Sequence, residues 1–426
     1  MAPMSSRDEN ALEPVELIRQ SGAVLRVGRA MLTSGTGSFR VKTAMDQVAQ
    51  ALGLDRHEAH VTLTEITGTS YRGPIFRTEV AEVHSMGVNS NKLLKLTEMV
   101  NGLQPGTTPE QVMAAVDEID RTPPLYPAWA NAAFAGVACG AFAYLNNGGL
   151  VEVVGVTVSA GIGQYVRRFF LHRKINQFAA TMLAAAVACL AYLGFLAALD
   201  VATGGAASSH EAGFISAVLF TVPGFALVTG ALDLAKLDFS AGVARTAYAL
   251  MILTSAALAV WAFSWATGLQ PEPVPPADTP YLLTLALRLV ASAFGVLGFA
   301  LMFNSPVRMA LGATAIGMVA NTLRLELASA GVAVQAATMV ATFVVGLLAA
   351  WVAPRLRVPR ITVSVPAVVI MVPGAAAYRA VVALNNGDAQ VAVTSGAQAV
   401  FVVISIAVGL AAGRILTDRE WRYEKG

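Results

Sequence analysis

From Tyr126 to Leu416 the sequence is a series of long apolar runs separated by short polar breaks. Over the whole chain, 55% of residues are hydrophobic and 13% are charged, well below the roughly 25% charged residues of soluble domains. Because the core of a bilayer is about 30 Å thick, a helix needs about 20 mostly apolar residues to cross it. The runs therefore predict a polytopic membrane protein made mostly of α-helices.

The first 124 residues differ from the rest, since they contain 12 Lys and Arg and 15 Asp and Glu. Helical spacing of apolar residues and strand-like alternation predict a small α+β domain over residues 1–124. We expect helices at 13–33, 37–53, 91–102 and 109–120, and strands at 60–66 and 75–83. Thr108 and Gln111 have the spacing of a capping box at the start of the last helix. The polar, acidic N-terminus predicts no cleavable signal peptide.

Ten membrane spans fit the apolar runs. We place them at 125–146, 148–166, 176–199, 212–232, 243–268, 281–303, 306–323, 330–353, 361–384 and 390–413. They form a first five-helix repeat (125–268) and a second (281–416), joined by a Pro-rich extracytoplasmic linker (269–280). Residues 417–426 form a cytoplasmic tail.

The charges of the short loops predict the orientation. Ten basic residues fall in the loops of one side: Arg167, Arg168, Arg173, Lys174, Lys236, Arg245, Arg308, Arg355, Arg357 and Arg360. Arg324 alone falls on the other side. The positive-inside rule therefore places both ends of the chain in the cytoplasm and the protein in the cell (inner) membrane. Because each repeat has an odd number of spans, the second is upside down relative to the first, which is an inverted repeat.

A helix-breaking sequence occurs once in each half. Val222-Pro223-Gly224 and Val372-Pro373-Gly374 lie 150 residues apart, each within an apolar run. Proline removes a backbone donor, and broken helices in membranes are tolerated only where protein or water satisfies the freed groups. One interpretation of each Pro-Gly pair is a simple proline kink with no role in binding. Paired breaks in an inverted repeat point to the substrate site of a transporter, so we predict that Pro223, Gly224, Pro373 and Gly374 bind substrate.

Charged residues near the breaks add further candidates. Arg379 lies six residues beyond the second proline, where its guanidinium could hold a substrate carboxylate in a bidentate way, or reach outward to the membrane surface. Asp233, Asp238 and Asp388 follow the breaks and are candidates for ion coupling or gating; helix capping is the alternative. Arg288 is a weaker candidate.

Other functions lack the residues that they need. A membrane-anchored hydrolase would need a catalytic set in the N-terminal domain, where no nucleophile elbow accompanies the serine and histidine residues: Ser21, Ser34, Ser38, His57, His60 and His84. Cys139 and Cys189 fall in apolar runs and predict neither a disulfide nor a metal site. No motif predicts a cofactor, and the basic residues form no stripe for nucleic acid.

The chain resembles the threonine/serine exporter family over essentially its whole length. The N-terminal residues that carry the resemblance are Leu32-Thr33-Ser34-Gly35, Ser38, Arg40-Val41, Met45, Ala51-Leu52-Gly53-Leu54, Arg77 to Val83, Gly87-Val88-Asn89 and Lys92-Leu93. Both membrane halves also show the family's Pro-Gly followed by aspartate. Relatives often have acidic residues where this chain has Thr36, Gly37 and Lys42, so a role of those carboxylates does not carry over.

The resemblance implies a cytoplasmic N-terminal domain, ten spans, and export of threonine, serine or similar small amino acids driven by the proton motive force. Relatives divided into two polypeptides are associated with a small dicarboxylate such as succinate, which is the alternative substrate. The partners that the resemblance implies are the substrate, protons and the lipid bilayer. A passive channel and homo-oligomerisation stay open at this point.

Overall fold

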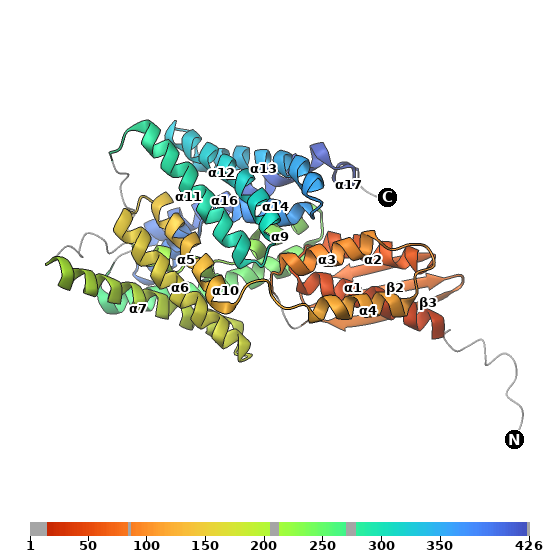
Figure 1. Ribbon diagram of the computed structural model, residues 1–426. Coiled ribbons are helices and arrows are strands. Elements are labelled where there is room, and N and C mark those ends of the chain that lie inside the picture. Colours follow the sequence, from red (N-terminus) through yellow and green to blue (C-terminus); the bar gives the residue numbers. More distant parts are fainter. Residues whose placement is uncertain (1–14, 84–86, 205–212, 270–277, 424–426) are drawn as a thin grey trace, which may run out of the picture. The chain divides into compact units, whose positions relative to one another are not determined.

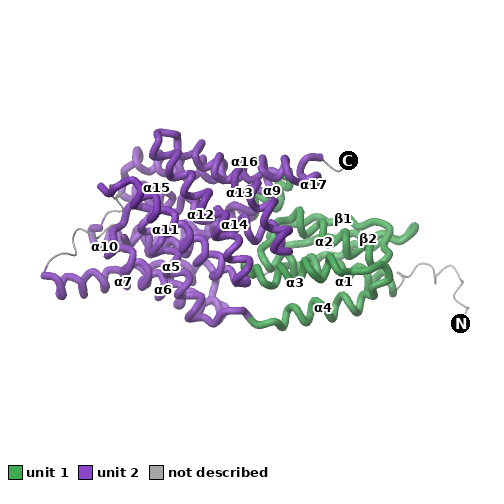
Figure 2. The backbone as a smooth tube through the Cα atoms, turned by 45° about the horizontal axis from the view of Figure 1, so that its top comes forward, with its two compact units in different colours: residues 1–123, 236–244 green, residues 124–235, 245–426 purple. Residues whose placement is uncertain are grey.

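The computed structural model describes residues 15–83, 87–204, 213–269 and 278–423, and the chain divides into two compact units (Figures 1 and 2). Unit 1 comprises residues 1–123 together with 236–244, and unit 2 comprises 124–235 together with 245–426. Most of the predicted linker 269–280 lies outside the described residues.

Unit 1 is a three-stranded antiparallel sheet with helices packed against it. Its elements are α1 (Val15–Thr33), α2 (Ser38–Ala51), β1 (Arg56–Val61), β2 (Glu65–Arg72), β3 (Ile75–Glu82), α3 (Ser90–Asn101) and α4 (Pro109–Arg121). The strand order is β1-β2-β3, and His57 pairs with Ser70 in the first ladder. α1 packs on β2 and β3 through a fully buried face that includes Leu17, Val24 and Val27. Burial of this amphipathic face gives the sheet its core.

The strand predicted at 60–66 is wrong, because the chain turns in the middle of it. β1 ends at Val61 and β2 begins at Glu65. In the turn, Thr62 N–H donates to Glu65 O at 2.8 Å, and Thr62 Oγ1 accepts a hydrogen bond from Glu65 N–H at 3.1 Å. Val61 and Leu63 keep the apolar alternation up to the turn, and only the change of phase at Ile66 marked the end of the strand.

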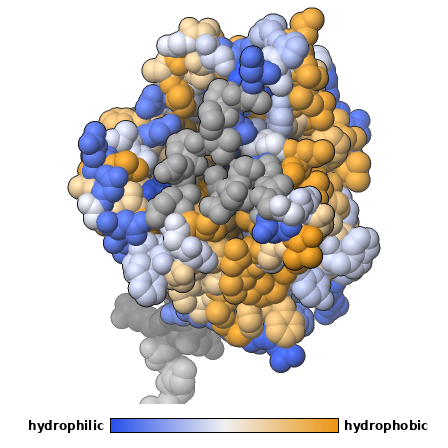
Figure 3. Space-filling model, turned by 90° about the vertical axis from the view of Figure 1, so that its left-hand side faces the viewer, coloured by the Kyte–Doolittle hydropathy of each residue, from blue (hydrophilic) through white to orange (hydrophobic). Residues whose placement is uncertain are grey.

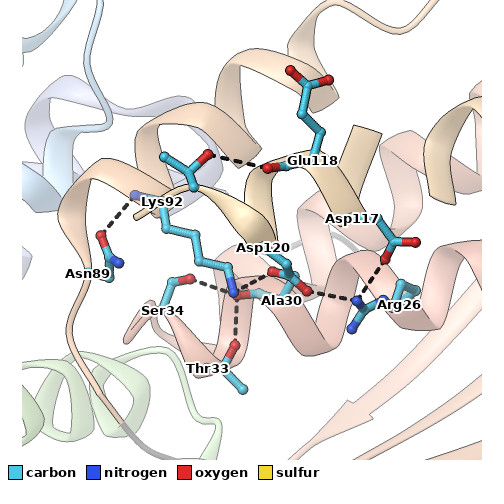
Figure 4. Close-up of polar contacts among 10 residues, drawn as sticks. Arg26, Ala30, Thr33, Ser34, Asn89, Lys92, Asp117, Glu118 and Asp120 are labelled. Atoms are coloured by element: carbon cyan, nitrogen blue, oxygen red, sulfur yellow. Dashed lines mark hydrogen bonds and ion pairs between the residues drawn. The ribbon is translucent and has the colours of Figure 1, made fainter. Parts of the chain in front are cut away.

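Charged side chains join the helices of unit 1 to one another (Figure 4). Arg26 of α1 contacts Asp117 at 3.0 Å and Asp120 at 2.7 Å, both on α4. Lys92 of α3 also reaches Asp120, at 2.5 Å, while Asn89 caps α3. The capping box predicted at the start of α4 is confirmed. These pairs are partly exposed, so they fix the helices in position more than they stabilise the unit.

Unit 2 consists of helices. In order they are α5 (Ala128–Leu145), α6 (Leu150–His172), α7 (Gln177–Thr203), α8 (Phe214–Ala217), η3 (Leu219–Thr221), α9 (Gly224–Ala235), α10 (Phe239–Thr267, whose first residues belong to unit 1), α11 (Tyr281–Met302), α12 (Val307–Ser329), α13 (Val334–Leu356), α14 (Arg360–Val369), α15 (Gly374–Asn385), α16 (Ala389–Thr417) and α17 (Arg419–Arg422).

Among the described residues, six helices are long and apolar enough to cross a membrane, or up to eight if each of two bent pairs is one span. α6 and α12 have 23 residues each but are more polar, so the number ten stays a prediction. Apolar side chains such as Leu250, Trp265, Leu282 and Phe401 are more than half exposed on these helices, and Figure 3 shows such residues at the surface of unit 2. Exposed apolar surface of this extent is typical of a multi-pass membrane protein.

The two halves of unit 2 match element by element. α6 and α12 have 23 residues each, α9 and α15 have 12, and α10 and α16 have 29. Residues with left-handed backbone recur at the same turns: Asn147 and Asn304 lie 157 positions apart, and Leu237 and Gly387 lie 150 apart. Asn147 is therefore the counterpart of Asn304.

Candidate functional site

The chain breaks at both Pro-Gly pairs. η3 ends at Thr221 and α9 begins at Gly224, with a bend of 56° between the helices on either side. α14 ends at Val369 and α15 begins at Gly374, with a bend of 49°. In each break the glycine N–H donates to the carbonyl of the valine two residues before it, at 2.8 Å. The two breaks thus have the same local geometry.

The structure brings the two breaks into contact. A Cβ atom added to Gly374 would lie 2.7 Å from Cγ2 of Val222, in the first break. A Cβ atom added to Gly224 would lie 3.2 Å from Cγ1 of Val369 and 3.5 Å from Val372, in the second. Each glycine therefore allows a valine side chain of the other break to approach closely. A larger residue at either glycine would fit only if the neighbouring side chains moved. The four residues predicted to bind substrate gather in one place.

A buried hydrogen bond also joins the two breaks. Thr221 Oγ1 and Tyr378 Oη lie 2.6 Å apart, and the Thr221 hydroxyl also lies 2.6 Å from the carbonyl of Val218. Neither Thr221 nor Tyr378 is exposed. Sequence reasoning missed both residues. The available signal was a tyrosine within an apolar run, because a buried tyrosine hydroxyl usually requires a partner.

Arg379 follows Tyr378 in α15 and is half-buried. No hydrogen bond or ion pair joins it to another residue in the described part of the chain. One residue corresponds to about 100° around a helix, so Arg379 projects from a neighbouring face to that of Tyr378. The structure thus places Arg379 in α15, six residues after Pro373.

Asp233 takes part in a buried ion pair. One of its carboxylate oxygens lies 3.0 Å from Nε of Arg245, and both side chains are only 4% exposed. The pair joins the end of α9, directly after the first break, to α10. Two buried charges of opposite sign hold each other, and removal of one would leave the other uncompensated.

Asp238 and Asp388 occupy equivalent positions but have different partners. Asp388 is exposed and caps α16, where its Oδ1 accepts from Val391 N–H at 3.1 Å. Asp238 belongs to unit 1, where its Oδ2 accepts from Ser38 Oγ at 2.6 Å and from Lys42 Nζ at 2.7 Å. The two aspartates thus have the same spacing from the preceding proline but different structural roles: Asp388 caps a helix, and Asp238 bonds two side chains of α2.

The serine and histidine residues of unit 1 form no accessible catalytic pair in the described residues. His57 Nδ1 lies 3.0 Å from Ser70 Oγ across the β1–β2 ladder, but Ser70 is fully buried and no substrate could reach it. Burial lowers the pKa of His57, an effect partly offset by Asp46 and Glu58. Ser21 donates to Glu79, and Ser34 donates to a backbone carbonyl. His84 lies outside the described residues.

Comparison with known proteins gives a consistent result over both halves. The family model described as "Putative threonine/serine exporter" matches residues 23–267, and the one described as "Threonine/Serine exporter, ThrE" matches residues 288–416. No solved structure matches.

Three relatives illustrate the range of names. A "Probable threonine/serine exporter" of Mycobacterium tuberculosis is 25% identical over 446 residues, which cover 100% of this chain and 81% of the relative. A "Threonine/serine exporter" of Corynebacterium glutamicum is 24% identical over 96% of this chain and 86% of its own length. A "Probable succinate transporter subunit YjjP" of Escherichia coli is 25% identical over 55% of this chain and 90% of its own length.

Proposed function

Because the chain belongs to the threonine/serine exporter family, we propose that it is a secondary exporter of threonine, serine or similar small amino acids. The observation that supports this most is the mutual contact of the two helix breaks through Gly224 and Gly374. Paired broken helices are a known way to build a substrate site inside a membrane.

The breaks offer groups of both signs to a zwitterion. The N-termini of α9 and α15 present the positive end of the helix dipole, which favours a carboxylate. The last carbonyls of η3 and α14 present the opposite polarity, which favours an ammonium group. In this proposal Pro223, Gly224, Pro373 and Gly374 line the site, and Arg379 pairs with the carboxylate.

Coupling to protons belongs to the same proposal. The Asp233–Arg245 pair connects α9 with α10. Protonation of Asp233 would weaken the pair and free α9 to move, so the pair could couple a proton to the opening of the first break. Asp238 and Asp388, at the following turns, are the other candidates for ion coupling or gating.

The proposed architecture is a ten-span inverted repeat in the bacterial inner membrane, with both ends in the cytoplasm. The equal helix lengths of the two halves support the repeat, and the loop charges support the orientation. Alternating access would then consist of one repeat moving against the other around the paired breaks.

A transport assay tests the proposal. Purified protein in proteoliposomes loaded with labelled threonine should show saturable efflux that an imposed pH gradient changes, and excess unlabelled serine should compete. Empty liposomes are the control. Flux that never saturates and ignores the pH gradient would indicate a channel. Absence of threonine and serine flux would contradict the proposal.

Succinate is the second candidate substrate. It rests on the relative named as a succinate transporter subunit, which matches about half of this chain. The same proteoliposomes, loaded with labelled succinate, separate the two: saturable succinate efflux without threonine efflux would favour the dicarboxylate.

A further inference from the structure

α6 and α12 carry the same polar pair at the same place. Gln164 and Arg167 are the fifteenth and eighteenth residues of α6, and Asn321 and Arg324 are the fifteenth and eighteenth residues of α12. The two pairs lie 157 positions apart, which is the spacing of Asn147 and Asn304 in the turns before these helices. Charged residues at corresponding places inside membrane helices are costly and are usually functional.

The amide of each pair is buried and held by the preceding helix. Gln164 Nε2 donates to Asn131 Oδ1 of α5 at 2.9 Å. Asn321 Nδ2 donates to Ser292 Oγ of α11 at 2.8 Å, and its Oδ1 accepts from Arg324 Nε at 3.0 Å. Both halves thus have the same arrangement. The preceding helix holds a side-chain amide by a hydrogen bond, and an arginine follows the amide one turn further along the same helix.

Two other arginines of unit 2 have an acidic partner, which Arg167 and Arg324 lack among the described residues. Arg245 pairs with Asp233 at 3.0 Å, and Arg288 pairs with Glu326 at 2.7 Å. Within the described ranges, neither Arg167 nor Arg324 has an ion pair, and the Nε atom of Arg167 is buried without a hydrogen bond. Each guanidinium has donors left over for an anion.

Arg167 lies at the first break. Gly163, one turn before it on the same face of α6, is so close to Phe220 of η3 that an added Cβ would lie 2.7 Å from the ring. Phe220 precedes Thr221, whose hydroxyl bonds Tyr378, so Arg167 lies one helical turn from the contact between α6 and the first break.

Arg324 lies toward the second break. α12 and α14 run side by side in the same direction, because Cβ atoms added to Gly312 and Gly317 would lie 3.7 Å from Val363 and 2.9 Å from the carbonyl of Ala367. Ala367 lies two residues before the end of α14, where the second break begins. Arg324 is about two turns beyond Gly317 on the same face of α12, so it lies past this contact in the direction of the break.

We propose that Arg167 and Arg324, in addition to Arg379, are carboxylate-binding residues of the substrate site, one beside each helix break and related to each other by the internal repeat. The proposal rests on the transport function and deepens it, since it names the group of the substrate that is recognised. A guanidinium binds a carboxylate through two parallel hydrogen bonds.

The test compares threonine with threoninamide, which has the same shape and ammonium group but no carboxylate. In proteoliposomes containing the full chain, wild-type protein should bind threonine much more tightly than threoninamide, measured by competition against labelled threonine. Arg167→Gln and Arg324→Gln should each raise the half-saturating threonine concentration at least tenfold and reduce the preference over threoninamide. Arg173→Gln, which removes an exposed charge from the turn after α6, is the matched control and should behave as wild type.

The outcomes separate this proposal from the transport function. In one outcome, the wild-type protein exports threonine, and the glutamine variants insert normally and keep the full preference over threoninamide. This result would overturn the proposed role of the arginines but not the transport function. A wild-type protein that moves neither threonine, serine nor succinate would overturn both. If the glutamine variants do not insert, Arg167→Lys and Arg324→Lys keep the charge but lose the bidentate fork. They should raise the half-saturating concentration several-fold, and an unchanged value would contradict the proposal.

Discussion

The carboxylate of Asp238 bonds two residues of α2. Lys42 Nζ contacts it at 2.7 Å. Ser38 adds a hydrogen bond at 2.6 Å, and Lys236 lies over the ring of Phe39. Unit 1 thus includes the turn before α10, so changes in α2 reach that turn directly.

Reversal of one charge in this pair should loosen the turn. Lys42→Glu would place a second carboxylate beside Asp238, and the lost pair is worth about 1 kcal/mol because the lysine is one-third exposed. We expect about fivefold faster amide exchange in residues 236–244 of the full-length protein, measured by hydrogen–deuterium exchange. The double variant Lys42→Glu with Asp238→Lys should restore much of the protection. Equal exchange in the single variant and the wild type would show that the pair does not hold the turn.

His57 should make unit 1 sensitive to mild acid. Burial lowers its pKa in the folded state, so below pH 6.5 the unfolded chain takes up a proton that the folded chain resists. Stability should therefore fall as pH decreases from about 7, by at most about 1.4 kcal/mol per pH unit for this one proton. Hydrogen–deuterium exchange of β1 and β2, corrected for intrinsic rates, measures the effect.

The control for this prediction lies on the same strand. His57→Gln should reduce the loss of protection between pH 7 and pH 5.5, whereas His60→Gln, which changes an exposed histidine, should leave it as in wild type. If His57→Gln and wild type lose protection equally, the sensitivity has another origin.

At the scale of elements, the contact between the breaks depends on the absence of a side chain at Gly374. Gly374→Ala would place a methyl group 2.7 Å from Val222 and 2.9 Å from Leu219, and overpacking of this kind costs about 1–3 kcal/mol. We expect at least a tenfold loss of threonine flux and a lower melting temperature in detergent. Gly194→Ala in α7, where nothing lies within 4 Å, should change neither.

A second change should compensate for the first. Val222→Ala makes room for the new methyl group, so the double variant with Gly374→Ala should recover stability and part of the flux. No recovery would mean that the loss arises from the helix start at Gly374 and not from the contact between the breaks.

Elements that are governed by neighbours in sequence were predictable. The capping box of α4 depends on Thr108 and Gln111, three residues apart, and both helix breaks depend on adjacent Pro-Gly pairs. The turn between β1 and β2 was missed, because Thr62 and Glu65 form it without glycine or proline.

The site was predictable only in part, for a physical reason. The Pro-Gly pairs can be recognised from adjacent residues, whereas the hydrogen bond between Thr221 and Tyr378 joins residues 157 positions apart. Arg167 was assigned to a loop from hydropathy, yet α6 continues to His172 and places it inside the helix. Only the folded chain shows which polar residues within apolar runs face one another.

At the scale of the whole molecule, the matching halves allow two arrangements. Equal lengths of α6 and α12, and of α10 and α16, would follow from a parallel repeat as well as from an inverted one. The predicted count of five spans in each half and the loop charges favour inversion. Inversion matters for function. In an inverted repeat, the outward-open state can form when each repeat takes up the conformation that the other repeat has in the inward-open state.

Corresponding turns should therefore lie on opposite sides of the membrane. Arg173, at the end of α6, and Ala330, at the end of α12, are both exposed and lie 157 positions apart. In a background with Cys139→Ala and Cys189→Ala, an impermeant maleimide added to intact spheroplasts should label Ala330→Cys but not Arg173→Cys. Permeabilised cells, in which both should react, are the control. Labelling of both residues, or of neither, in intact spheroplasts would exclude the inverted repeat, and with it alternating access by exchange of the two halves.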